Sequence, residues 1–183
     1  FFITFFIFFS FKVFSLEVTL TQGSVKPTPI AVTELYSKNS QLTKVGKNIS
    51  TVIADNLERS GLFLPIDKRS FIQDNQSLSN KPRFEDWKLI KAQHLVSGKI
   101  SSNNGKISVE FRLYDVFQQK QIVGKKYETN EKNWRRVAHI ISDSIFKNIT
   151  GEGGYFDTRI VYVAETGPKE NKQKRLAIMN QDQ

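Results

Sequence analysis

Apolar residues recur along this chain at two spacings, one helical and one alternating. Two stretches place them three and four positions apart, which is the spacing of one helix face. This pattern predicts long helices near residues 41–60 and 131–150. Their apolar positions are Leu42, Val45, Ile49, Val52, Ile53 and Leu57 in the first, and Trp134, Val137, Ala138, Ile141, Ile145 and Ile149 in the second. Phe84, Trp87 and Ile90 predict a third, shorter helix.

The remaining apolar positions predict strands. One run alternates apolar and polar residues, which is typical of a strand with one buried face. Its apolar positions are Ile107, Val109, Phe111 and Leu113, and the Asn104-Gly105 pair before it suits a hairpin turn. Further strands are expected at 30–35, 63–67, 94–101 and 121–129, and residues 74–82 are expected to form a polar loop. The order of elements predicts an α+β fold over residues 29–155, in which two long helices and one short helix pack on a mixed β-sheet.

The first fifteen residues, FFITFFIFFSFKVFS, differ in kind from the rest. They contain eight of the 15 phenylalanines, and residues 1–11 are uncharged and mostly apolar. That length is too short to cross a bilayer as a helix but suits the hydrophobic region of an export signal. A buried strand or a membrane anchor is the alternative. We expect a truncated signal peptide at 1–15, cut after Ser15, and a mature protein that leaves the cytoplasm.

A short arm is expected at residues 16–28. Its first five residues alternate, with Leu16, Val18 and Leu20 on one face and Glu17 and Thr19 on the other. Thr21, Gln22 and Gly23 continue the arm, and Gly23, Pro27 and Pro29 are expected to act as a hinge. Glycine permits unusual backbone angles, and proline lacks the N–H that a strand ladder needs. In the alternative reading, the arm is an edge strand of the chain's own sheet.

The charge balance is basic. Lysine and arginine number 27 against 18 acidic residues, for a formal charge of +9. Nucleic acid or an anionic membrane surface is therefore a possible partner. The charges are scattered, however, and lysine outnumbers arginine, the residue that reads phosphate and guanine in a bidentate manner. We therefore expect a solvated surface and no nucleic-acid partner. The densest basic cluster is Lys169, Lys172, Lys174 and Arg175.

Candidate chemistry is sparse. The chain has no cysteine, which excludes disulfides, thiolate zinc sites and a thiol nucleophile. His94 and His139 lack a second ligand at metal-binding spacing, and His139 is expected to be a hydrogen-bonded residue beside its helix stripe. The glycine-rich run 151–154 follows a helix and does not precede one, so it does not predict a phosphate site. We expect no catalytic residue, no metal or other cofactor, no small-molecule substrate, and no enzymatic activity.

Three tracts resemble the TolB family of exported bacterial proteins. They are NWRRVAHIISDSIFKNITGEGGYFDTRIVYVAE at 133–165, GSVKPTPIAV at 23–32 and NLERSGLFLPIDK at 56–68. The resemblance implies an N-terminal α/β domain followed by a six-bladed β-propeller. Residues 156–164 and 175–180 would then be the first two propeller strands. It follows that residues 156–183 are expected to be a fragment of the first blade, and the chain an N-terminal piece of a longer protein.

The resemblance also implies a function. TolB-like proteins are periplasmic members of the Tol–Pal system, which supports outer-membrane integrity and envelope constriction in cell division. The arm, Leu16 to Gly23, would bind a TolA-like inner-membrane protein, and a Pal-like lipoprotein would bind only where the propeller is present. Two alternatives stay open from the residues alone. One is a basic domain that binds nucleic acid or an anionic surface, and the other is a gene fragment without function.

Overall fold

The computed structural model describes residues 26–182. In order along the chain, the elements are β1 (Thr28–Val32), α1 (Ser40–Arg59), β2 (Phe63–Pro65), the 3-10 turn η1 (Lys68–Ser70), α2 (Asn75–Asn80), α3 (Phe84–Leu89), β3 (His94–Asn103), β4 (Lys106–Asp115), β5 (Lys120–Asn130), the 3-10 turn η2 (Glu131–Asn133), α4 (Trp134–Thr150), β6 (Arg159–Thr166) and β7 (Gln173–Asn180).

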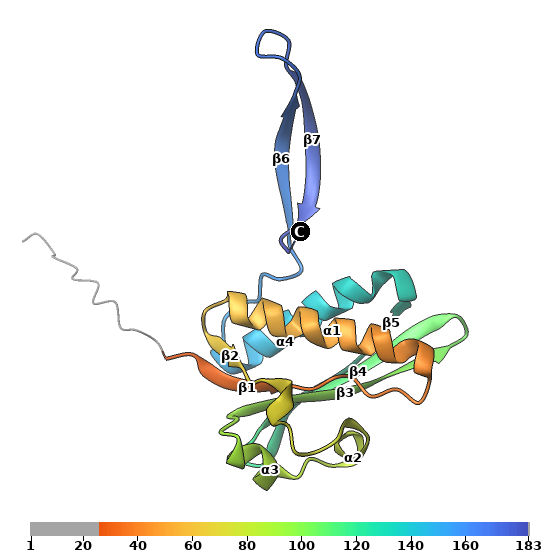
Figure 1. Cartoon of the computed structure of the whole chain (residues 1–183), viewed down its shortest axis with the longest axis vertical. Coiled ribbons are helices and arrows are strands. Elements are labelled where there is room, and N and C mark those ends of the chain that lie inside the picture. Colours follow the sequence, from red (N-terminus) through yellow and green to blue (C-terminus); the bar gives the residue numbers. More distant parts are fainter. Residues whose placement is uncertain (1–25, 183) are drawn as a thin grey trace, which may run out of the picture.

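Five of the strands form one mixed sheet in the order β2-β1-β3-β4-β5. β1 is parallel to both of its neighbours, whereas β3, β4 and β5 form an antiparallel meander. Helices α1 and α4 lie side by side on one face of this sheet, and α2 and α3 lie on the other (Figure 1). The predicted α+β fold is confirmed, with helices on a mixed sheet.

Local sequence signals account for the limits of α1. Asn39 precedes the helix, and its side chain accepts a hydrogen bond from the backbone N–H of Gln41, as an N-cap residue does. Gly61 follows the helix with a φ of 73°, a left-handed conformation that glycine adopts without strain. The helix thereby forms the crossover between the parallel strands β1 and β2.

The β3–β4 hairpin forms where the Asn-Gly pair predicted it. Asn104 and Gly105 have φ values of 49° and 75°, so both central residues are left-handed, as in a type I′ turn. The turn fixes the register that pairs Asn103 with Lys106 and, farther along, Gly98 with Phe111. That register directs the alternating apolar residues of β4 toward α1 and α4.

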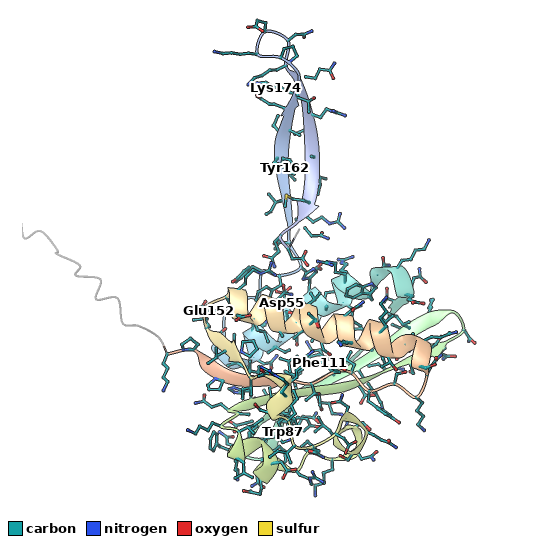
Figure 2. All side chains as sticks on the ribbon, viewed as in Figure 1. Asp55, Trp87, Phe111, Glu152, Tyr162 and Lys174 are labelled. Carbon is teal, nitrogen blue, oxygen red and sulfur yellow. The ribbon has the colours of Figure 1, made fainter. Side chains whose placement is uncertain are left out.

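Two apolar clusters lie on opposite faces of the sheet. The larger cluster, under α1 and α4, contains Phe111, Val52 and Ile141, so the predicted burial of both helix stripes is confirmed. The smaller cluster surrounds Trp87 of α3. Figure 2 shows Phe111 and Trp87 on the two sides of the sheet. The described residues contain no helix that is both long and apolar enough to span a membrane.

The prediction of a polar loop at 74–82 was wrong, because this segment contains helix α2. Asp74 caps the helix by accepting hydrogen bonds from the N–H groups of Gln76 and Ser77, and Leu78 is buried. The buried Gln73 side chain braces the segment, since it accepts from Trp87 Nε1 and donates to the Lys81 carbonyl. One apolar residue in nine gives no periodicity, so only the Asp74 cap signalled this helix.

The first strand begins slightly earlier than the expected residue 30. β1 begins at Thr28, whose N–H donates to the Leu62 carbonyl, and Pro29 is the second residue of the strand. A hinge of the expected kind would therefore have to precede Thr28, with Pro27 adjoining it. The expected signal peptide at 1–15 and the arm residues 16–23 lie outside the described residues.

The first strand after α4 begins slightly later than the expected residue 156. Phe156 is 1% exposed and contacts Phe146 of α4 edge to face, so it belongs to the main core, and the first hairpin strand begins at Arg159. β6 and β7 pair only with each other and project away from the α1–α4 layer (Figure 1). Their exposed apolar residues are Ile160, Val161, Tyr162, Val163, Leu176 and Ile178.

The close approach of β3 to β4 gives a test of this packing. A Cβ added at Gly98 would lie 2.1 Å from the Glu110 carbonyl oxygen and 3.0 Å from Phe111 Cα. We expect Gly98→Ala to lower the free energy of unfolding by about 1–3 kcal/mol in urea denaturation, because neither backbone atom can move freely. Gly153→Ala is the control, since nothing lies within 4 Å of its added Cβ. Equal stability of the two variants would contradict this packing.

Candidate functional site

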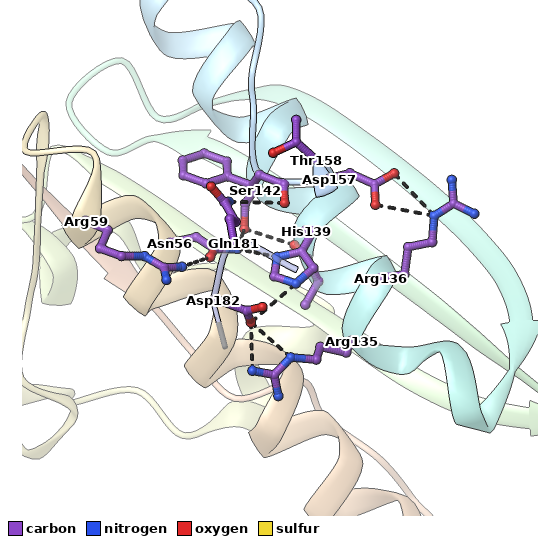
Figure 3. A network of polar contacts seen from close by, with 12 residues as sticks. Asn56, Arg59, Arg135, Arg136, His139, Ser142, Asp157, Thr158, Gln181 and Asp182 are labelled. Carbon is purple, nitrogen blue, oxygen red and sulfur yellow. Dashed lines mark hydrogen bonds and ion pairs between the residues drawn. The ribbon is translucent and has the colours of Figure 1, made fainter. Parts of the chain in front are cut away.

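A cluster of polar side chains, several of them buried, lies where α1, α4 and the residues after β7 meet (Figure 3). We call it the junction network. Its members are Asn56 and Arg59 of α1, Arg135, His139 and Ser142 of α4, and Asp182 after β7. Three separate parts of the chain therefore converge on one polar cluster beside an apolar core.

Helix geometry explains how the network members meet. His139 and Ser142 are three residues apart, so they share one face of α4. That face packs against α1, where Asn56 interrupts the apolar stripe beside Leu57. Asn56 and Ser142 are fully buried, and His139 is 3% exposed. A polar group at such a position is stable only when it is hydrogen-bonded.

The Asn56 side chain joins the two helices. Its Nδ2 lies 3.0 Å from Ser142 Oγ and 3.0 Å from His139 Nδ1, while its Oδ1 accepts from Arg59 Nη2. Ser142 Oγ in turn donates to the Ala138 carbonyl. Because the Asn56 amide donates toward His139, Nδ1 of the imidazole is an acceptor and the neutral ring carries its proton on Nε2.

Asp182 connects the end of the hairpin to α4. Its side chain is only 6% exposed, and Oδ2 accepts from Arg135 Nη2 at 2.7 Å and Nε at 2.9 Å. His139 Nε2 lies 3.4 Å from the same oxygen. The neighbouring Gln181 Nε2 donates to the Phe156 carbonyl at 3.1 Å. The end of β7 is thereby held against both α4 and the segment that precedes β6.

A second set of contacts holds that preceding segment. Asp143 of α4 accepts hydrogen bonds from the backbone N–H groups of Phe156 at 2.7 Å and Asp157 at 3.1 Å. Arg136, also on α4, pairs with the Asp157 carboxylate at 3.2 Å. Gly154 lies against the Asp143 side chain, and a Cβ added at this glycine would be 2.3 Å from Asp143 Oδ1. A side chain at position 154 would therefore push the carboxylate out of place.

The electrostatic environment favours neutral His139. Burial lowers the pKa of the imidazole below its ordinary value, and this effect outweighs the attraction of Asp182, which raises it. Arg135 and Arg59 lower the same pKa, and Asp157 raises it. The network can thus bind a proton only against the cost of burial. The arrangement therefore suits a structural contact between α4 and Asp182 whose strength depends on the charge of His139.

The other candidate residues of the sequence lie apart from this cluster. His94 is on β3 opposite Asp115, and burial lowers its pKa while Asp115 raises it. Within residues 26–182, no group of three or more potential metal ligands comes together. Of the basic cluster near the hairpin tip, Lys172 and Lys174 both pair with Glu165.

The sequence identified His139 as a hydrogen-bonded residue, and the structure confirms it. The sequence analysis did not identify any partner of these contacts, namely Asn56, Ser142, Asp143 and Asp182. A usable signal existed for the first two, since a polar residue inside a helical apolar stripe must find a partner when it is buried. Asp182 gave no such signal. The expected partner-binding residues Leu16 to Gly23 lie outside the described part of the chain.

The histidines predict how stability depends on pH. Both pKa values are lowered from 6.5 by burial, so between the lowered value and 6.5 the unfolded chain binds more protons than the folded one. The free energy of unfolding should therefore be fully present above pH 6.5 and fall as the pH drops below it. We expect His139→Asn to show a smaller loss than the unaltered chain between about pH 7.5 and about pH 5.5 in urea titrations. Identical losses would show that His139 does not contribute.

The Asp143 contacts predict a specific loss of stability. Asp143→Ala removes the acceptor of two backbone N–H groups, one of them on the buried Phe156, and we expect it to cost about 1–3 kcal/mol. Amide hydrogen exchange at Phe156 and Asp157 should accelerate in parallel. Asp55→Ala is the matched control, because Asp55 is an exposed carboxylate on α1 and should change stability by less than about 0.5 kcal/mol. Similar losses in both variants would contradict the assignment.

Comparison with known proteins identifies the family. The model of the TolB amino-terminal domain matches residues 16–122. The Tol-Pal system protein TolB of Paramagnetospirillum magneticum is 48% identical over 168 residues, which cover 91% of this chain and 38% of that protein. The crystal structure of TolB from Acinetobacter baumannii aligns with a TM-score of 0.69 at 24% identity, over 86% of this chain and 37% of that one.

The crystal structure of the lipoprotein GNA1162 from Neisseria meningitidis aligns with a TM-score of 0.46 at 14% identity, over 57% of this chain and 81% of that chain. The chain spans less than two fifths of the length of the TolB proteins that it matches. The domain match covers more than half of the chain, and the resemblance carried by the three sequence tracts is confirmed. This chain belongs to the TolB family.

Proposed function

We propose that this chain is part of a non-enzymatic periplasmic interaction protein of the Tol–Pal system, which supports outer-membrane integrity and envelope constriction in cell division. The observation that carries the proposal is the 48% identity to a protein named for that system, over 91% of this chain. Because the chain spans 38% of that relative, the activity and partners of the whole protein belong to the proposal.

The chemistry of the described residues supports interaction over catalysis. Asp182, whose side chain is nearly buried, contacts both His139 and Arg135, and these contacts hold separate parts of the chain together. A surface depression of about 400 Å³ lies between the β1–α1 loop and the end of β3, and the only charged side chains that line it are Lys38 and Lys99. Neither arrangement contains a nucleophile paired with a base, which covalent catalysis requires.

Within this proposal, residues 16–26 of the arm bind a TolA-like inner-membrane protein by adding a strand to the partner's sheet. Leu16, Val18 and Leu20 would bury one face, and the backbone groups would pair with the partner's edge strand. Lys26 is exposed, and strand pairing begins only at Thr28. Residues 26 and 27, the described residues before β1, therefore lie outside the paired part of that strand.

The edges of the chain's own sheet are poor alternative sites for the arm. β2 at one edge is three residues long and ends in Pro65, which cannot donate to a neighbouring strand. β5 at the other edge exposes Lys120, Lys125 and Lys126, and lysines on an edge strand oppose further pairing. These features favour a partner's sheet over the chain's own.

A Pal-like lipoprotein would bind the propeller of the longer protein. This chain contributes β6 and β7, whose apolar residues are exposed on both faces. A two-stranded hairpin is marginal by itself and needs further strands or layers. We therefore assign no Pal-like contact to individual residues of this chain.

The arm can be tested by pull-down with the C-terminal domain of the TolA-like protein. We expect the chain that starts at residue 16 to bind, and the chain that starts at residue 27 to lose binding with an unchanged circular-dichroism spectrum. Point variants refine the test. Val18→Lys would place a charge on the face that becomes buried and should abolish capture, whereas Thr19→Lys, on the opposite face, should retain it.

Two outcomes would contradict this mechanism. Equal capture of the two chains would remove the arm from the interaction. Equal effects of Val18→Lys and Thr19→Lys would show that the arm binds without burying one face of a strand.

A further inference from the structure

We propose that the junction network is an acid-sensitive latch, in which neutral His139 holds the end of the β6–β7 hairpin against α4 and protonation of His139 favours its release. The inference goes beyond the proposed function and does not depend on a role in the Tol–Pal system. It rests on the contacts of Asn56, His139 and Asp182 in the structure.

The first step is the position of the proton on neutral His139. Asn56 Nδ2 donates to Ser142 Oγ and lies 3.0 Å from His139 Nδ1, and Asn56 Oδ1 accepts from Arg59. Rotating the amide by half a turn would break the contacts with both Ser142 and Arg59. The amide is thus held with its donor toward the ring, so Nδ1 stays unprotonated in the closed state.

The second step is the consequence of protonation. An imidazolium carries N–H groups on both nitrogens, so its Nδ1–H would face the Asn56 amide donor at 3.0 Å. Two donors at that distance repel each other. Either the Asn56 amide rotates and leaves its α1 and α4 partners, or the ring moves away from α1. Both changes disturb the position of the ring beside Asp182.

The contact between His139 and Asp182 is long and leaves polar atoms without a partner. His139 Nε2 and Asp182 Oδ1 are buried atoms without a hydrogen-bond partner, and the 3.4 Å from Nε2 to Oδ2 is long for a hydrogen bond. Arg135, which is itself partly exposed, makes the shorter contacts with Asp182. The latch therefore combines a short, partly exposed ion pair between Arg135 and Asp182 with a longer, buried contact between His139 and Asp182.

Burial and the charges around the ring together determine the direction of the switch. Facing groups come from every packed element: Arg59 from α1, Arg135 from α4, Asp157 from the segment before β6, and Asp182 from the residues after β7. Arg136 in turn pairs with Asp157. Burial is the largest influence on the pKa of His139 and lowers it, and it exceeds the attraction of the nearby carboxylates.

Release follows from linkage. In the closed state His139 is 3% exposed, and the Asp182 carboxylate lies beside its Nε2 (Figure 3). Motion of residues 181–182 away from α4 would expose the Nε2 side of the ring to water, which reduces the burial that lowers its pKa, and would also remove the attraction of Asp182. Because burial is the larger of these two effects on the pKa, its loss decides the outcome. Because the open state binds the proton more readily, acid shifts the equilibrium toward it.

The test follows the ring and the hairpin end together by NMR of the unaltered chain between about pH 8 and about pH 5. We expect the imidazole nitrogen shifts of His139 to report the Nε2–H tautomer above pH 6.5 and to titrate below it. The backbone amides of Gln181 and Asp182 should move with the same midpoint and lose their protection from hydrogen exchange. Asp182→Asn should shift the His139 midpoint to lower pH, because it removes an attracting carboxylate.

A pair of histidine variants supplies the control. His139→Asn keeps an acceptor for the Asn56 amide but cannot titrate, so the pH-dependent change at Gln181 and Asp182 should disappear. His94→Asn should retain that change, since His94 lies opposite Asp115 on the sheet. The proposal is overturned if His139 stays neutral down to pH 5, if it titrates while the two amides stay unchanged, or if the change persists in His139→Asn.

Discussion

The packing of α1 against α4 over one face of the sheet determines where the rest of the molecule lies. Ile49 and Ile53 of α1 and Ile141 and Ile145 of α4 are completely buried in this layer. A buried amide, Asn56, lies between the same helices and is satisfied only when both keep their present register. The apolar area supplies the driving force, and the amide selects one register from those that hydrophobic packing alone would permit.

In that register, α4 contacts the segment before β6 and the residues after β7. Arg135 and His139 face Asp182, while Asp143 receives the backbone of Phe156 and Asp157. Arg135, His139 and Asp143 all project from α4, and this helix packs against α1 and the sheet. A disturbance at Asn56 would therefore reach the end of the hairpin through α4.

Features that depend on near neighbours could be predicted from the sequence. The stripe of α1, its cap at Asn39 and the left-handed Gly61 involve residues within a few positions of one another, and the Asn104-Gly105 turn is equally local. The prediction was wrong for α2, where Leu78 is the one buried residue and no period exists.

The junction network depends on contacts that no local pattern encodes. His139 and Asp182 are far apart in sequence, with two strands between them, and Asn56 is 83 residues from His139. A polar residue in an apolar stripe indicates that a hydrogen-bond partner is needed, but the sequence does not identify that partner. Only the fold brings the three together, since α1 and α4 must first cover the same face of the sheet.

The hairpin shows why these contacts are needed. In an antiparallel pair the beginning of β6 lies beside the end of β7, as the pairing of Arg159 with Asn180 shows. Asp143 holds the chain just before β6, and Arg135 holds it just after β7, so α4 grips both strands at the same end. Val161, Val163, Leu176 and Ile178 share one face of the hairpin, and Ile160, Tyr162, Ala177 and Met179 share the other. Both faces of the hairpin thus carry apolar residues, and the contacts with α4 at its base hold it to the domain.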